Sequence, residues 1–519
     1  MMFFGAVVLG AVCFRLPTVI PAPQEMSCRT NETVRIVDGL KVVVACPDAA
    51  ADKWIREKAR LWFDADVSVE CVEKADAALG DEGYRLTAEP ECVRIEATGL
   101  QGVRYALYTL RQTAEPIPEG RTLSGWWLPT LQVRDVPALR FRGLHLCAFP
   151  EQTVRFLERQ IRLAAYYKYN HVVLETWGVF RSEKFPFLSV TNAYLTTVET
   201  KRLATLARDL GVTLIPQFNV FGHATGARFS SGSHVTLDRH PQYAPLFEPA
   251  GGWNWCLTNP ATRDVLKELL VELHAAFLDP PFVHIGCDEA NLPSCARCRA
   301  AGPYWKLFAA HVTELAAALR SRGARTMMWH DMLLDHGDPR WKGFYANGTE
   351  GMATYVRDAL PKDIVVCDWY YGKVPDGGDY PTLRHFRDCG FDTLTCPWTE
   401  TSGVASQGAF ACANGLYGVL QTVWINFRGG EFGRIAAAGA AAGWGSAAFA
   451  EPEIPFGTSP VPHPFATHWR QVGWDQNAVV EKSSVLDLRL RELEMKRISL
   501  ASVAVPPGGC AKITWKIGE

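Results

Sequence analysis

The chain contains the stretch Phe282-Val283-His284-Ile285-Gly286-Cys287-Asp288-Glu289-Ala290, in which an apolar run leads into two adjacent carboxylates. A Pro-Pro turn at residues 280–281 precedes it and ends a helical pattern, so residues 282–287 predict a short buried strand. Two acids at the end of a buried strand are costly unless they are hydrogen-bonded or functional. An exposed turn with two solvated acids is the simpler alternative, and the surrounding sequence must decide between the two.

Similar apolar runs recur on both sides of this stretch and alternate with helical patterns. The predicted strands are 140–148, 170–177, 212–219, 282–288, 325–331, 363–370, 391–398 and 416–424. The predicted helices between them include 152–168, 198–210, 260–278, 303–322 and 381–389. Eight strands with intervening crossovers predict an α/β protein with a (β/α)8 TIM barrel over residues 137–450. An open doubly wound sheet is the competing fold, but no Gly-rich phosphate loop follows any strand.

Three further segments flank the predicted barrel. Residues 18–136 alternate strand and helix patterns and predict a small α+β accessory domain, in which the Pro- and Gly-rich residues 116–137 form a linker or crossing segment. Residues 451–519 predict a C-terminal helical extension that packs on the barrel. Residues 1–17 are a possible leader, too short for a membrane span and without the basic start of a secretory signal. We expect an exported protein, periplasmic or extracellular, with a cytoplasmic one as the alternative.

Composition narrows the class of partner. A net charge of −2 on 519 residues gives no reason to expect nucleic acid or an anionic membrane. No other segment predicts a membrane span.

Cys295 and Cys298 form a Cys-x-x-Cys pair, but no second pair or His-x-x-x-His follows nearby, which favours a local disulfide or two thiols over zinc. Other cysteines inside apolar runs are expected to be buried thiols: Cys147, Cys287, Cys367 and Cys396.

Tryptophan marks the ends of the predicted barrel strands. Five tryptophans each lie at the C-terminal end of one predicted strand: Trp177, Trp329, Trp369, Trp398 and Trp424. In a barrel of this kind the C-terminal ends of the strands meet on one face and carry the active groups. A single Trp there is usually core or rim, but five are hard to explain by packing alone. Because aromatic faces stack on the apolar faces of sugar rings, a carbohydrate site is favoured.

Polar residues follow the same strand ends. Arg142 lies in the first strand, where a buried guanidinium needs acceptors such as sugar hydroxyls. His223 follows the third strand, and Gly222 is expected to permit the turn that points it inward. Asp331 follows Trp329 on the fifth strand. Together these side chains predict a polar ring around aromatic walls.

These residues resemble the motifs of glycoside hydrolase family 20, the β-N-acetylhexosaminidases. The resemblance is carried by Arg142-Gly143-Leu144, by the run 216–223, and by His284-Ile285-Gly286-Cys287-Asp288-Glu289, and it extends over about residues 18–450. It implies a retaining hydrolase of terminal β-linked GlcNAc or GalNAc, in which the substrate's 2-acetamido oxygen attacks the anomeric carbon. The implied partner is a glycan or glycoconjugate with terminal N-acetylhexosamine. No cofactor and no metal is implied.

The resemblance also implies residue roles. Glu289 would be the general acid, and Asp288 would orient the acetamido group and stabilise its developing charge. Arg142 would bind ring hydroxyls, while tryptophans would enclose the acetamido group and the sugar. The predicted substrate-binding set is Arg142, Glu175, His223, His284, Trp329, Asp331, Trp369, Tyr370, Trp398, Trp424 and Asn426.

Several positions depart from the family pattern. Cys287 replaces the second Gly of the acidic signature. The seventh strand ends in Cys396-Pro397-Trp398 and lacks the Tyr that binds the acetamido oxygen, so Tyr370 or Tyr371 would substitute. Asn426 stands where the family has a Glu that reads sugar hydroxyls. The sequence therefore predicts a divergent branch whose catalytic pair is kept and whose hydroxyl-reading residues are changed.

These departures leave alternatives open. A non-catalytic carbohydrate-binding barrel would keep the fold without turnover. A retaining glycosidase with its own nucleophile would use Glu175 or Glu400 together with Glu289. A protein that binds metal through Cys295 and Cys298 would contain stoichiometric zinc.

Overall fold

The structure is a computed structural model that describes residues 19–72, 75–119, 122–150, 152–190, 193–225, 236–249, 252–424 and 432–446. The expected leader at 1–17, the expected extension at 451–519, and Asn426 lie outside the described residues. Within the described ranges, no helix is both long and apolar enough to cross a membrane.

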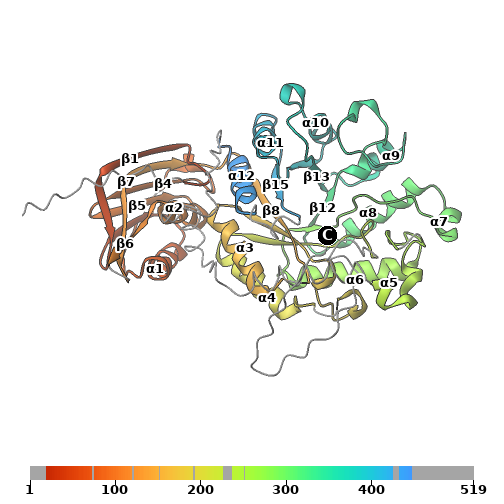
Figure 1. Cartoon of the computed structure of the whole chain (residues 1–519), viewed down its shortest axis with the longest axis horizontal. Helices are drawn as coiled ribbons and strands as arrows, with labels where there is room; N and C mark the ends of the chain where they lie inside the picture. Colours follow the sequence, from red (N-terminus) through yellow and green to blue (C-terminus); the bar gives the residue numbers. More distant parts are fainter. Residues whose placement is uncertain are drawn as a thin grey trace, which may run out of the picture. The chain divides into compact units, whose positions relative to one another are not determined.

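Eight parallel strands close into a barrel in the order β10-β11-β12-β13-β14-β15-β8-β9. Figure 1 labels β8, β12, β13 and β15 among the helices that surround them. The strands are β8 (Phe141–Cys147), β9 (His171–Glu175), β10 (Thr213–Gln217), β11 (Phe282–His284), β12 (Arg325–Trp329), β13 (Val365–Trp369), β14 (Asp392–Cys396) and β15 (Gly418–Thr422). Each lies within its predicted range, so the predicted (β/α)8 barrel is confirmed. Every strand is shorter than predicted, because residues at one or both ends leave the ladder. Those at the C-terminal end enter the loops that carry the site.

The helices that cover the barrel divide into two groups. The sequence pattern predicted α3 (Val154–Tyr166), α4 (Thr197–Asp209), α6 (Pro260–Ala276), α8 (Tyr304–Arg320) and α10 (Pro381–Asp388). It missed α5 (Thr236–Arg239), α7 (Ala296–Ala301), α9 (Ala353–Ala359), α11 (Thr401–Ala413) and α12 (Phe432–Trp444). The last two are rich in Ala and Gly and have no polar stripe to mark a helical period. A Cβ on Gly408 would lie 2.7 Å from the Ala442 Cβ, so small residues let α11 and α12 pack closely.

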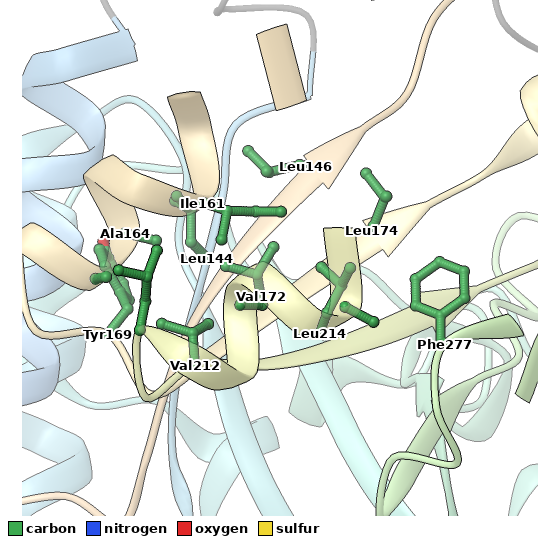
Figure 2. Close-up of a cluster of buried hydrophobic side chains, with 14 of the residues drawn as sticks. Leu144, Leu146, Ile161, Ala164, Tyr169, Val172, Leu174, Val212, Leu214 and Phe277 are labelled. Atoms are coloured by element: carbon green, nitrogen blue, oxygen red, sulfur yellow. The ribbon is translucent and has the colours of Figure 1, made fainter. Parts of the chain in front are cut away.

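The barrel strands are apolar on both faces, as buried parallel strands are. Leu144 of β8, Val172 of β9 and Leu214 of β10 face outward and pack with Ile161 and Ala164 of α3 (Figure 2). The alternate residues form a separate cluster inside the barrel, which includes Phe141, Val173, Ile215, Met327 and Leu394. This alternation decides which side chains of a strand can reach the interior and which cannot.

A smaller sheet precedes the barrel, with the strand order β1-β7-β4-β5-β2-β3 and β6 paired to β7. Its strands are β1 (Glu25–Ile36), β2 (Lys41–Ala45), β3 (Ser68–Val72), β4 (Tyr84–Glu89), β5 (Cys92–Ala97), β6 (Glu115–Glu119) and β7 (Thr122–Asp135). Two helices accompany it, α1 (Ala50–Phe63) and α2 (Leu100–Thr113).

The predicted linker at 116–137 is wrong, because most of it forms β6 and the long strand β7. Leu131 and Val133 alternate with more exposed residues and are buried, which is a strand pattern. Pro129 is tolerated because it pairs with Thr33, where the register of β1 shifts. The Pro and Gly content of this stretch therefore marks a bulge rather than a chain without regular structure.

Polar side chains join this sheet to the barrel. Lys168, which follows α3, is fully buried, and its Nζ donates to Tyr84 Oη at 2.9 Å and to Asp135 Oδ2 at 3.2 Å. Trp444 of α12 donates from Nε1 to the other oxygen of Asp135 at 2.7 Å. Since a buried charge is tolerated only when it is paired and hydrogen-bonded, this network fixes the end of β7 against the barrel.

Candidate active site

The two carboxylates lie in the loop that follows β11. The strand ends at His284, and the backbone then adopts positive φ at Gly286 (67°), Cys287 (75°) and Glu289 (46°). Left-handed backbone at non-glycine residues is uncommon and costs of order 1–3 kcal/mol, and it concentrates at functional sites. Gly286 is required sterically, because a Cβ there would lie 1.9 Å from Asn219 Oδ1.

Asp288 and Glu289 share one histidine. The Nε2 atom of His223 lies 3.3 Å from Asp288 Oδ2 and 3.4 Å from Glu289 Oε2. The Asp288 side chain is 10% exposed, whereas that of Glu289 is 51% exposed. Asp288 Oδ1 is buried and has no hydrogen-bond partner among the described residues. The pair therefore divides into a largely buried carboxylate with one unpaired oxygen, Asp288, and a half-exposed carboxylate, Glu289.

His223 is held in the charged form. Burial alone would lower its pKa, but the charge of Asp288 and the hydrogen bonds to Asp288 and Glu289 outweigh burial and raise the pKa to about 10. The residue itself has φ of 54°, so the left-handed turn expected at Gly222 is at His223 instead. Gly222 serves close approach, because a Cβ there would lie 2.1 Å from the carbonyl oxygen of Asp288.

Asp331 fixes the backbone beneath the pair. Its Oδ2 accepts hydrogen bonds from the Glu289 amide and from Asn347 Nδ2, both at 2.9 Å. The side chain is fully buried. Burial and the charge of Asp288 raise its pKa. The predicted site residue Asp331 is thus brought next to the acids, where it acts on the loop through the Glu289 amide.

Aromatic rings from successive strand ends lie against one another. The ring centroids of Trp329 and Trp424 are 5.7 Å apart. Tyr371 lies 5.2 Å from both Trp369 and Trp398, and its hydroxyl accepts from Trp424 Nε1 at 2.8 Å. The Trp329 Nε1 is buried and unpaired among the described residues. The structure therefore brings together four of the predicted tryptophans.

The fifth strand-end tryptophan and an unpredicted one lie beside His223. The centroid of Trp177 is 6.2 Å from the His223 ring, and that of Trp253 is 4.2 Å away. Trp253 also donates from Nε1 to the Glu289 carbonyl at 2.7 Å. Trp253 comes from the long loop after β10, and no strand end or motif marks it in the sequence.

Tyr370 and Tyr371 point to different surroundings, and the sequence could not decide which of them lies among the tryptophans. The hydroxyl of Tyr370 donates to the Lys373 carbonyl at 2.9 Å, and its ring packs with Phe344 and Tyr380, away from the tryptophans. Tyr371 alone joins them. The selection of Tyr370 is corrected accordingly, since consecutive residues at a strand end point in opposite directions.

A buried polar layer lies deeper in the barrel. The Nε2 atom of His145 lies 3.1 Å from Gln217 Oε1 and 3.4 Å from Glu175 Oε2. The His145 ring contacts Trp424 at 4.7 Å, and His284 contacts Trp329 at 4.5 Å. His145 was missed, although its spacing from Phe141 in β8 places it on the inner face.

The ionisation of this layer follows from its burial. Burial and the charge of His145 lower the pKa of His284 well below the ordinary value, so His284 is neutral. Its Nε2 is buried without a partner among the described residues, while its Nδ1 accepts from the Gly286 amide at 3.1 Å. His284 and Glu175 therefore lie below the aromatic rings, with His284 directly beneath Trp329.

Arg142 is not part of this site, which corrects the prediction. Its guanidinium donates to both oxygens of Glu82, at 2.8 and 2.9 Å, and to Tyr105 Oη at 2.7 Å. The side chain is enclosed near Trp444, with the guanidinium carbon 5.1 Å from that ring. Arg142 has the outward-facing parity of β8, so its charge is satisfied between the barrel and the smaller sheet.

Comparison with known proteins identifies related sequences. Residues 16–136 match the family model "Glycosyl hydrolase family 20, domain 2", and residues 141–373 match "Glycosyl hydrolase family 20, catalytic domain". The chain is 27% identical over 334 residues to a β-N-acetylhexosaminidase of Cellulomonas fimi, covering 58% of this chain and 62% of that protein. It is 24% identical over 365 residues to a β-hexosaminidase of Vibrio furnissii, covering 62% and 58%.

Solved structures show the same fold. The β-N-acetylhexosaminidase of Streptomyces coelicolor matches with a TM-score of 0.63 at 19% identity, over 89% of this chain and 98% of that one. The aligned region spans about 60% of the length of these two curated relatives, and about the same share of this chain. The fold and the family follow from these matches, whereas the roles of individual residues have to be argued from the geometry.

Proposed function

Because the chain belongs to glycoside hydrolase family 20, we propose that it removes terminal β-linked N-acetylhexosamine from a glycan or glycoconjugate. The reaction retains the anomeric configuration and uses the substrate's 2-acetamido group as the nucleophile. The observation that carries this proposal is the Asp288–Glu289 pair held by His223 at the C-terminal end of the barrel, next to a cluster of tryptophans.

Glu289 is the proposed general acid. Its carboxyl group is half exposed and can reach a bound ligand. In the first step it protonates the glycosidic oxygen while the acetamido oxygen attacks the anomeric carbon, and the bond to the leaving sugar breaks. In the second step the Glu289 carboxylate takes a proton from water, which attacks the same carbon and opens the cyclic intermediate.

Asp288 is the proposed partner of the acetamido group. Its Oδ1 is buried and free to accept a hydrogen bond from the acetamido N–H. That bond would align the acetamido oxygen with the anomeric carbon, and the carboxylate would stabilise the positive charge of the oxazolinium-like intermediate. His223 supports both roles, since one imidazolium contacts Oδ2 of Asp288 and Oε2 of Glu289.

The aromatic cluster supplies the proposed sugar contacts. Trp329, Trp369, Trp398 and Trp424 offer apolar surfaces, and the Tyr371 hydroxyl lies among them. We assign to Tyr371 the hydrogen bond to the acetamido oxygen that the family pattern expects from the seventh strand. His284 and Glu175 lie below this cluster and position it.

Two observations disfavour a protein nucleophile. Glu175 is 2% exposed and contacts His145 and Cys147, so its carboxylate is engaged inside the barrel. Glu400 caps α11 by accepting from the Ser402 amide at 3.4 Å and from its hydroxyl at 2.8 Å. Both carboxylates are thus engaged by other groups of this chain, which disfavours either of them as a nucleophile beside Glu289.

A panel of aryl glycosides tests the proposal. We expect hydrolysis of the aryl N-acetyl-β-glucosaminide or galactosaminide, and no hydrolysis of the matched β-glucoside, which lacks the acetamido group. A thiazoline that mimics the cyclised intermediate should inhibit. Glu289→Gln should lower kcat by about 10³-fold or more, whereas Glu400→Gln, the matched control, should keep activity within about twofold.

Two results would overturn this function. Sugar binding without turnover of any 2-acetamido substrate would identify a non-catalytic carbohydrate-binding barrel. Equal turnover of substrates with and without the acetamido group, with no thiazoline inhibition, would identify a glycosidase with a protein nucleophile.

A further inference from the structure

A second polar cluster lies beside the catalytic loops and is not used by the proposed reaction. It consists of Glu248, Cys256, Cys295 and Cys298, whose carboxylate oxygen and three sulfurs all lie within 4.8 Å of one another. Glu248, Cys256 and Cys298 are buried, and Cys295 is partly exposed. We propose that these four residues bind a structural zinc ion, which the reaction itself does not require.

The sulfur positions fit a tetrahedral thiolate site. Cys256 Sγ lies 3.8 Å from Cys295 Sγ and 3.6 Å from Cys298 Sγ. Thiolates that bind one zinc at about 2.3 Å in a tetrahedron are about 3.8 Å apart. A disulfide would need about 2.05 Å, and all described cysteines are free thiols. The Cys-x-x-Cys pair is therefore not a disulfide here.

The environment of the Glu248 carboxylate is the second observation that points to a bound cation, beside the packing of the three thiols. One carboxylate oxygen, Oε2, accepts hydrogen bonds from the amides of Ser294 and Cys295, both at 2.7 Å. The other, Oε1, is buried and has no hydrogen-bond partner among the described residues. Burying an unpaired carboxylate oxygen is costly, and a cation bound by the neighbouring sulfurs would satisfy it.

The surroundings already contain the hydrogen bonds that orient metal ligands. The Cys298 amide donates to Cys295 Sγ at 3.2 Å, and Thr258 Oγ1 lies 3.2 Å from Cys298 Sγ. Donors to thiolate sulfurs and to the second carboxylate oxygen are the usual support of such a site. Three soft thiolates favour zinc over calcium or magnesium, and four protein ligands leave no open position for a substrate.

The site would tie together the two loops that carry the catalytic groups. Glu248 and Cys256 belong to the loop after β10, which also carries His223 and Trp253. Cys295 and Cys298 belong to the segment after β11, six residues and more beyond Glu289. The loops also meet directly, because Asn254 Oδ1 accepts from the Asn291 amide at 3.1 Å. Zinc would therefore hold the backbone on which Glu289 sits.

Metal analysis of the full chain tests this site independently of activity. The protein is purified without an affinity tag, reduced, dialysed and analysed for metal. We expect about one equivalent of zinc, and replacement by Co²⁺ should give the visible and charge-transfer absorption of tetrahedral cobalt thiolate. A strong chelator should lower the melting temperature by about 5 °C or more, and added zinc should restore it.

Variants assign the ligands. Cys298→Ser should lose the zinc and the cobalt thiolate absorption, whereas Cys71→Ser, which removes an exposed thiol of the smaller sheet, should keep both. Glu248→Gln keeps all three thiols, so it tests the zinc site even if Cys298→Ser fails to fold. It should bind zinc at least about tenfold more weakly in competition with a chromophoric chelator.

Three outcomes would overturn the proposal. They are protein that carries less than about 0.1 equivalent of zinc and gives no cobalt thiolate absorption, a disulfide among the three cysteines in the purified chain, and unchanged zinc affinity in Glu248→Gln. None of these depends on glycoside hydrolysis, so a failure of the proposed function would leave this test intact.

Discussion

At the residue scale, the site depends on one imidazolium between two carboxylates. The pKa of His223 is raised to about 10, mainly because the attraction of Asp288 and the hydrogen bonds to both acids outweigh the effect of burial. Because folding raises the pKa of this histidine from about 6.5, the folded chain binds the proton more tightly than the unfolded chain. The resulting stabilisation is fully present below about pH 6.5. This stabilisation is lost progressively as the pH rises through 10.

The stability of the protein should therefore fall on the alkaline side through this residue. Between pH 6 and pH 10, the free energy of unfolding of the native chain should decrease by about 4 kcal/mol more than that of His223→Gln, as a shift of this size requires. Urea unfolding of both proteins at both pH values measures it. The difference between the two proteins removes the contributions of lysine and tyrosine titration. Parallel pH profiles for both would contradict the charged state of His223.

Asp331 should affect catalysis without touching the sugar. Asp331→Ala removes the acceptor of the Glu289 amide, so the strained loop relaxes and kcat for the aryl substrate should fall by about 10- to 100-fold with little change in KM. The matched control is Asp335→Ala, which removes a buried carboxylate that accepts from the Ala353 amide instead. The Asp335→Ala variant should have a lower free energy of unfolding but keep kcat within about threefold of the native value. Equal losses of kcat in both variants would mean that Asp331 acts only through folding.

At the element scale, the loop after β10 and the loop after β11 have to approach closely. Gly222 makes this possible, because its missing Cβ leaves room for the Asp288 carbonyl. The β11 strand itself is only three residues long, yet Trp329 still donates its amide to the Gly286 carbonyl at 2.9 Å. The acids are therefore held by neighbouring elements rather than by a continuous strand.

Gly222→Ala should consequently displace the loop that carries Asp288 and Glu289. A methyl group 2.1 Å from the Asp288 oxygen cannot be accommodated without backbone movement, and kcat should fall by about 100-fold or more. Gly99→Ala is the control, since Gly99 is extended with φ of −156° and a Cβ there meets nothing closer than 3.8 Å. Steady-state kinetics of both variants measure the effect, and full activity of Gly222→Ala would refute the close approach.

At the scale of the whole molecule, buried charges join the smaller sheet to the barrel. Arg142 with Glu82, and Lys168 with Asp135, bridge segments that are far apart in sequence. Such pairs add little net stability when complete, but removing one partner leaves the other without compensation. They specify how the end of β7 and the turn before β4 meet the barrel.

Arg142→Met should therefore be a stability variant and not a binding variant. We expect the free energy of unfolding to fall by about 2–4 kcal/mol, while KM for the aryl substrate stays within about twofold at a temperature where the variant is folded. Arg85→Met, which removes a partly exposed arginine paired with Asp76 and Glu96, should lower the free energy of unfolding by less than about 1 kcal/mol. A large increase in KM with normal stability would return Arg142 to the sugar site.

The sequence predicted the barrel well because each strand carries its own signal. Short apolar runs bounded by turns recur eight times, and the amphipathic helices between them have a clear period. It predicted less well where local signals are weak or ambiguous. The helices α11 and α12 lack a polar stripe because α12 is buried and the exposed side of α11 carries small residues such as Ala405 and Ala409. The prolines near β7 indicate a linker although one of them lies at a bulge.

The same difference between local and long-range signals applies to the candidate site. The adjacent acids and the strand-end tryptophans are local patterns, and their position in the sequence predicted where they would meet. The sequence could not decide between Tyr370 and Tyr371, or place Arg142 outside the barrel, because these outcomes depend on strand parity. Glu248 and Cys256 lie 47 and 39 residues before Cys295, so spacing along the chain could not join them to the Cys-x-x-Cys pair.

The sequence by itself therefore determined the barrel, the acidic pair and its aromatic surroundings, because hydrophobic period and turn residues act over a few neighbouring positions. Only the tertiary structure decided which side chains face the interior, which histidine joins the two acids, and which distant residues complete the cysteine cluster. Those contacts depend on the closure of the barrel and on the approach of loops from different strands, and no short stretch of sequence specifies either.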